Sequence, residues 1–173
     1  KRCLVGSEMC IRDSSNSITS TGTNSAGSAA TIDINGAVTL NDNDITFTTG
    51  GAGIDFSSTI VSGSTTPRAL TIAQGAGAVV INGNIGGTAN NDVGNITIGA
   101  TGNNGNITLS GDIGTDSVAG AAVVALGNAS TGLITLGGAE YNTSGTQTYT
   151  ADDYNLNGTA ITLTTSNDIC LLY

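Results

Sequence analysis

Several residue types on which catalytic and metal-binding sites depend are absent or scarce in this chain. It has no histidine and no tryptophan, one proline, two phenylalanines and four tyrosines among its 173 residues. Without histidine, the chain lacks the side chain that most often serves as a general base or metal ligand at neutral pH. Four basic residues stand against thirteen acidic ones, a formal net charge of −9. This balance offers no basic cluster for nucleic acid or for an anionic membrane.

The two ends of the chain differ from the rest. Residues 4–14 (LVGSEMCIRDS) resemble the translation of a transposase sequencing adapter, and residues 170–173 (CLLY) resemble the translation of part of its reverse complement. One DNA element read in two orientations accounts for both. We therefore expect residues 1–14 to be adapter-derived and outside the fold, residues 170–173 to be adapter-derived as well, and residues 15–169 to be one fragment of a longer reading frame.

The composition of residues 15–169 restricts the classes of site that they can hold. All three cysteines, Cys3, Cys10 and Cys170, lie in the two ends, so the remainder has neither a disulfide framework nor a thiolate metal site and is compatible with export. Arg68 is its only basic residue, against eleven dispersed acidic ones. The longest apolar run, 118–126, is far shorter than the roughly 20 residues of a membrane helix.

An internal repeat organises the chain between residues 70 and 115. The stretch 70–87 (LTIAQGAGAVVINGNIGG) reads against 96–115 (ITIGATGNNGNITLSGDIGT), and each copy holds two short alternating runs followed by a third that starts at Ile85 or Ile113. Alternation over three to five residues indicates strands, and the glycine and asparagine corners end each run before a helical period develops. A further pentad at 132–136 matches 105–109.

Short strands, glycine-rich corners and loops of variable length are what a β-solenoid requires. Each turn buries small branched side chains against the equivalent residues of the next turn, and its backbone pairs with both neighbours. With roughly 20-odd residues a turn, the sequence predicts about six to eight turns. The alternative is an antiparallel β-sandwich of short strands, for which larger aromatic core residues are expected.

Candidate chemistry along the chain is weak, and we assign no catalytic, cofactor-binding or metal-binding residue. Asp152-Asp153 is the only adjacent acidic pair, but neighbouring strand residues point to opposite faces and turn residues face water. Residues 50–55 (GGAGID) match the start of a calcium-binding nonapeptide once, whereas calcium rolls need several stacked copies. A glycine corner is the preferred interpretation. The sequence thus predicts no enzyme and no cofactor.

Two surface motifs have ordinary interpretations. Thr46 and Thr48, and likewise Thr146, Thr148 and Thr150, alternate as in ice-binding solenoids, which place Thr-x-Thr at the same position of every turn. They do not recur at one sequence offset, so strand preference for threonine explains them. Asn-x-Ser/Thr triplets, which are glycosylation acceptors in some secreted proteins, begin at Asn95, Asn106, Asn128, Asn142 and Asn157. Such triplets arise freely in a chain this rich in asparagine, serine and threonine.

Three segments resemble a recurring unit of large bacterial surface proteins: 37–47, 68–72 and 145–164. They look like the β-strand repeats of filamentous-haemagglutinin-like adhesins and autotransporter passengers. The resemblance implies a right-handed parallel β-helix, export across the outer membrane through a translocator, an extracellular or outer-membrane location, and a role as a stalk or adhesive surface. Its partners would be glycans or proteins of host or neighbouring cells, with neither nucleic acid binding nor membrane insertion. The alternative function is the stalk of a carbohydrate-active β-helix enzyme whose active region lies outside the fragment.

Overall fold

A computed structural model describes residues 17–20, 30–41, 43–63, 65–87, 92–99, 102, 105–115 and 118–173. These residues form seventeen β-strands and no helix. The strands stack in about five turns of a parallel β-solenoid, as predicted from the repeat. Residues 1–14, which we expect to be adapter-derived, lie outside the described residues, whereas residues 170–172 lie in the last strand.

Three sheets form the sides of the solenoid. The first holds β1 (Ser17–Ser20), β4 (Ile45–Thr49), β7 (Leu70–Ala73), β9 (Val93–Ile98), β11 (Ala121–Gly127), β14 (Gln147–Thr150) and β17 (Ile169–Leu172). The second holds β2 (Ile32–Ile34), β5 (Ile54–Phe56), β8 (Val79–Ile81), β10 (Ile107–Leu109), β12 (Leu133–Leu136) and β15 (Asp153–Leu156). The third holds β3 (Val38–Leu40), β6 (Ile60–Ser62), β13 (Glu140–Thr143) and β16 (Thr162–Thr165), linked through bridges at Ile85 and Ile113.

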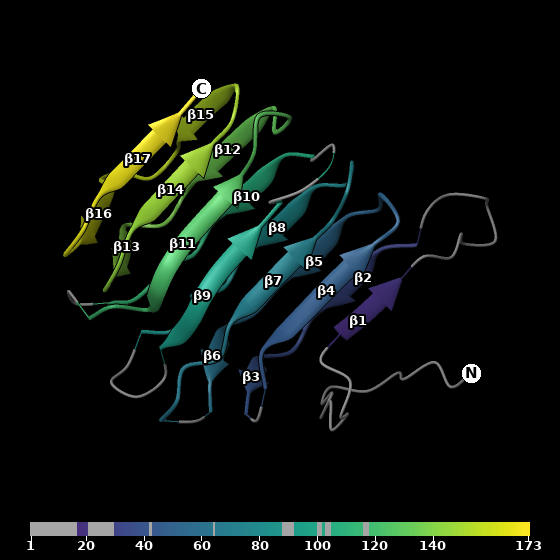
Figure 1. The fold of residues 1–173 in the computed structure, drawn as a ribbon, viewed down its shortest axis with the longest axis horizontal. Coiled ribbons are helices and arrows are strands. Elements are labelled where there is room, and N and C mark those ends of the chain that lie inside the picture. Colours follow the sequence, from purple (N-terminus) through teal and green to yellow (C-terminus); the bar gives the residue numbers. More distant parts are fainter. Residues whose placement is uncertain are drawn as a thin grey trace.

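The first sheet faces the viewer in Figure 1, with the second sheet behind it. Its strands run toward the upper right while the chain advances toward the upper left, so the coil is right-handed. All strand pairs between named strands are parallel, which excludes the antiparallel sandwich. A single pairing between Ala121 and Thr143 joins β13 to β11, so β13 and β16 also belong to the hydrogen-bonded network of the first sheet.

The register confirms the internal repeat at each of its three runs. Leu70 pairs with Ile96, Val79 pairs with Ile107, and Ile85 bridges to Ile113. The strands stack in about five turns, slightly fewer than the predicted six to eight, and hydrogen bonds between equivalent positions of the middle turns span 25 to 28 residues. Turns at both ends are shorter, since Ser62 bonds to Leu40 and Ser166 bonds to Ser144, in each case across 22 residues.

The core is a set of stacked apolar ladders inside the coil. On the strands of the middle turns most side chains alternate between buried and more exposed, and the buried ones line up from turn to turn, for example Phe47, Ile72, Ile98, Leu126 and Tyr149. Burying a branched side chain of this size stabilises the fold by about 1.5–3 kcal/mol. Phe47 and Phe56 meet edge to face at 5.1 Å and join the first and second sheets across the interior.

Glycines form a ladder of their own at the corner between the second and third sheets. A Cβ added at Gly111 would lie 2.5 Å from the backbone of Gly83, and one at Gly138 would lie 2.5 Å from the backbone of Gly111. Asp112 fixes the same corner, since its Oδ1 accepts hydrogen bonds from the backbone N–H groups of Ala139 and Glu140 at 2.6 and 3.0 Å. Backbones of successive turns thus approach too closely for a side chain.

The glycine ladder predicts a sharp difference between two neighbouring substitutions. Gly138→Ala places its methyl group against the backbone of Gly111 and should destabilise the protein by about 1–3 kcal/mol. Gly137→Ala meets its nearest atom, Ser110 Cα, at 3.4 Å and should change stability by no more than about 0.5 kcal/mol. Urea unfolding followed by circular dichroism measures both. Equal losses in the two variants would contradict the close approach.

Candidate functional site

Outward threonines form a row across the first sheet. Strand pairing places Ser17, Thr46, Thr71, Thr97, Ala125, Thr148 and Cys170 at one register position on β1, β4, β7, β9, β11, β14 and β17. Ser17 is exposed and the other six are partly exposed. From β7 to β14, the neighbours of these residues along the strand are buried. Three consecutive threonines, Thr46, Thr71 and Thr97, are uninterrupted.

A second row runs beside the first, two residues further along each strand. Thr19 pairs with Thr48 and Thr48 with Ala73, and further along the sheet Gly127 pairs with Thr150 and Thr150 with Leu172. We call the two rows together the threonine face. Threonines that do not recur at one sequence offset thus share register positions in the structure. Loops of different length between strands change the sequence offset but leave the register unchanged.

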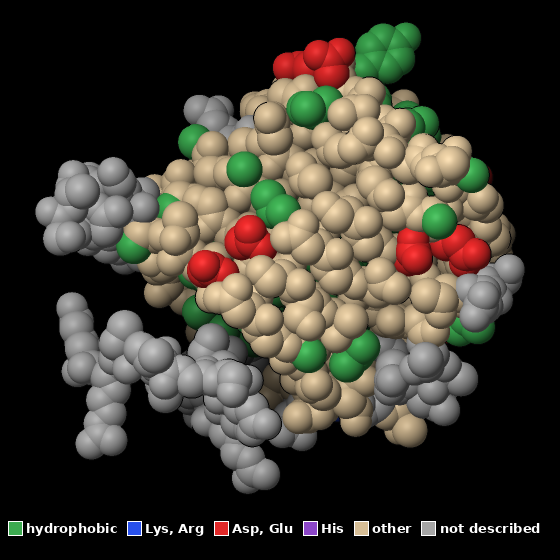
Figure 2. All heavy atoms as spheres, turned by 180° about the vertical axis from the view of Figure 1, so that it is seen from behind, with side chains coloured by type: hydrophobic (Ala, Val, Ile, Leu, Met, Phe, Trp, Pro, Cys, Tyr) green, Lys and Arg blue, Asp and Glu red, His purple; other side chains and the backbone are tan. Residues whose placement is uncertain are grey.

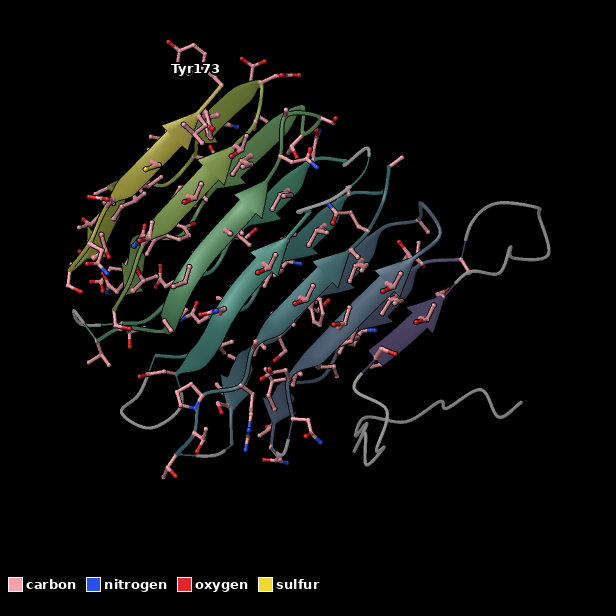
Figure 3. The ribbon with its side chains drawn as sticks, viewed as in Figure 1. Tyr173 is labelled. Atoms are coloured by element: carbon pink, nitrogen blue, oxygen red, sulfur yellow. The ribbon has the colours of Figure 1, made fainter. Side chains whose placement is uncertain are left out.

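The threonine face carries neither charge nor aromatic rings. None of the seven strands that form it contains Asp, Glu, Lys or Arg, and the aromatic residues Phe47 and Tyr149 of these strands are buried. Figure 3 shows the side chains of the sheet along its strands. From β1 to β14 the result is an uncharged surface on which small side chains, most of them threonine, predominate.

The second sheet has a different surface. Its corresponding outward row is Asp33, Asp55, Val80, Thr108, Thr135 and Asn155. Asp33 and Asp55 border a shallow hollow over β2, β5 and β8, and Asp55 accepts a long hydrogen bond of 3.4 Å from the amide of Asn82. Seen from behind, acidic side chains occur in small separate groups on a mostly polar surface (Figure 2).

The acidic pair weighed for catalysis and the segment weighed for calcium binding lie in different turns of the solenoid. Asp152 and Asp153 are both exposed at the start of β15, and their backbone N–H groups donate to the carbonyls of Thr131 and Gly132. Gly51 forms the corner between β4 and β5 with φ of +104°, as the glycine-corner interpretation predicts. Among the described residues, no group of three or more His, Cys, Asp or Glu is arranged to hold a metal ion. No helix of the described part is long and apolar enough to cross a membrane.

The glycosylation triplets differ in exposure. Asn142 is buried with 3% of its surface exposed, and its amide donates to Glu140 at 2.8 Å. Asn95, Asn106 and Asn157 are exposed, and Asn128 is partly exposed. Folding therefore conceals one of the five acceptors.

A buried polar cluster, missed from the sequence, lies inside the turns near the C-terminal end. The Gln147 amide donates to the carbonyls of Tyr141 and Thr164 at 2.7 and 2.8 Å, and its Oε1 accepts from the Tyr149 hydroxyl at 3.0 Å. The Tyr141 hydroxyl donates to the Leu109 carbonyl and accepts from the Gly138 N–H. Gln147 and Tyr149 occupy the inward-pointing positions of an alternating strand, and this pattern is the sequence signal for the cluster.

Burial sets the titration of the two tyrosines. Desolvation, the largest cause, raises the pKa of Tyr141 from 10.0 to about 12, with a smaller contribution from the negative charge of Asp112. Burial and the neighbouring Tyr141 also raise the pKa of Tyr149. The hydroxyl groups of both tyrosines make their hydrogen bonds in the neutral form. The cluster is therefore a buried part of the core.

Comparison of the chain with protein-family models, with curated proteins and with solved structures finds no match.

The two tyrosines predict a loss of stability in alkali. Because their folded-state pKa values exceed the ordinary value of 10.0, their contribution is complete below about pH 10 and is lost as the pH rises toward 12. Urea unfolding at several pH values measures this fall. Tyr149→Phe should be less stable near neutral pH, because it loses the bond to Gln147, yet show a shallower fall above pH 10. The same slope in both proteins would contradict the assignment.

Proposed function

We propose that this chain is a non-catalytic segment of a large secreted or cell-surface bacterial adhesin, in which it serves as an elongated stalk or an adhesive surface. The observation that carries the proposal is the unbroken stacking of parallel turns over the described strands. In such a solenoid each turn contacts only its neighbours, so length is added without changing the cross-section, and long uniform faces result. The segments that resemble adhesin repeats include strands of all three sheets.

The surface composition supports an extracellular location. Residues 15–169 carry one basic residue against eleven acidic residues and contain no thiol. Excess acidic charge keeps neighbouring copies apart and favours solubility. In the full-length protein, the partners would be an outer-membrane translocator during export, and glycans or proteins of host or neighbouring cells afterwards.

An adhesive role is tested with the full 173-residue chain coupled to fluorescent beads. We expect the beads to adhere to epithelial or bacterial cells more than beads that carry an unrelated acidic protein of equal charge. Thr97→Lys, on the threonine face, and Thr135→Lys, at the equivalent outward position of the second sheet, show which face is responsible. A folded chain that binds no cell type and no immobilised glycan would contradict an adhesive surface.

A stalk role is tested by pulling single molecules from their two ends. Because turns are held to one another by parallel ladders, the chain should lengthen one turn at a time, by roughly 80–90 Å for a turn of 25 residues. Regular steps at forces well above those of a collapsed coil are expected. A single low-force transition over the whole chain would contradict a load-bearing segment.

A further inference from the structure

The threonine face has features that neither a stalk nor a catalytic surface requires. Its first row places small residues at matching positions of six consecutive strands, from Ser17 on β1 to Thr148 on β14, and its second row holds Thr19, Thr48 and Ala73 on one side of the sheet and Gly127 and Thr150 on the other. Between β1 and β14 the positions without threonine include Ala73, Ala125 and Gly127, whose side chains are smaller than threonine. On β17 the rows end in Cys170 and in the larger, exposed Leu172. From β1 to β14 the face is therefore even in height as well as free of charge.

The spacing of this array is set by the backbone. Neighbouring strands of a sheet lie about 4.8 Å apart, and residues i and i+2 of a parallel strand lie roughly 6.6 Å apart. Threonine is branched at Cβ, so its χ1 angle is restricted and its hydroxyl and methyl groups keep fixed directions. Every described pair on this sheet is in register, hence the two spacings repeat over the face in two dimensions.

The usual anchors of molecular recognition are missing from the strands of the face. Protein interfaces are dominated by Trp, Tyr and Arg, and none of these points outward from β1, β4, β7, β9, β11, β14 or β17. Small ligands bind in concave pockets, whereas this surface is a sheet face. What it offers is a regular lattice of hydroxyl groups separated by methyl groups. A partner that fits this lattice is itself a periodic, uncharged surface that donates and accepts hydrogen bonds.

We propose that the threonine face binds ice. Methyl groups restrict the orientation of the water that surrounds them, and hydroxyl groups bond to that water directly. On a rigid lattice, the water above the face is held in a repeating arrangement that merges with the surface of an ice crystal. The activity is independent of the adhesive role proposed above, since it requires only the outward rows of the first sheet.

The test measures inhibition of ice recrystallisation by the full chain and binding of the fluorescently labelled chain to a single ice crystal. The wild-type protein should arrest crystal growth and coat the crystal. Thr71→Tyr places a large ring in the middle of the uninterrupted threonines and should raise the concentration needed by roughly tenfold or more, which corresponds to about 1.4 kcal/mol of binding.

Thr108→Tyr is the matched control, because Thr108 is also partly exposed in a strand of the same solenoid but points outward from the second sheet. It should retain wild-type activity. Circular dichroism melts show whether each variant is folded, and Thr97→Lys replaces Thr71→Tyr if the latter unfolds. A wild-type chain without effect on ice would overturn the proposal, as would equal activity in the face variant and the control. Binding to crystalline cellulose with none to ice would overturn ice as the partner.

Discussion

The structure depends on one constraint, which is that each turn must hydrogen-bond in register with the turns on both sides. A parallel strand has unpaired N–H and C=O groups along both edges, and a buried one without partners is costly. The coil satisfies these groups from turn to turn, as where Val79 donates to the Asn106 carbonyl and Ser110 donates to the Ile81 carbonyl. The core ladders, the glycine corners and the threonine rows all follow from that register, because equivalent positions are forced to stack.

Much of this could be predicted from the sequence, because the constraint leaves a pattern in it. The alternation of Leu70 with Ile72 and of Ile96 with Ile98 indicated both the strands and their pairing, and the structure pairs these residues as expected. The predicted number of turns was too high for a physical reason. Corner loops have no fixed length, and the middle turns use up to 27 or 28 residues, the upper end of the range assumed.

Two features were not predicted from the sequence, one on the surface and one in the core. The threonine rows were missed because their spacing along the chain varies, and only the register shows that Thr46, Thr71 and Thr97 are neighbours. The buried cluster around Gln147 was missed because a glutamine between threonines is an ordinary surface sequence. Its position opposite Val124 in the inward phase places it in the core, where it bonds to Tyr141 and Tyr149.

Variable corners in a fixed register have a consequence for how such a chain can change during evolution. The connection from β9 to β10 is longer than the one from β4 to β5, yet the strands on either side of both pair without a shift. Lengthening a loop costs only the slowly growing entropy of closing it. A corner can therefore accept an inserted peptide, even a folded one, while the strands around it stay as they are. The solenoid can therefore serve as a scaffold that acquires additional modules as insertions in its corner loops.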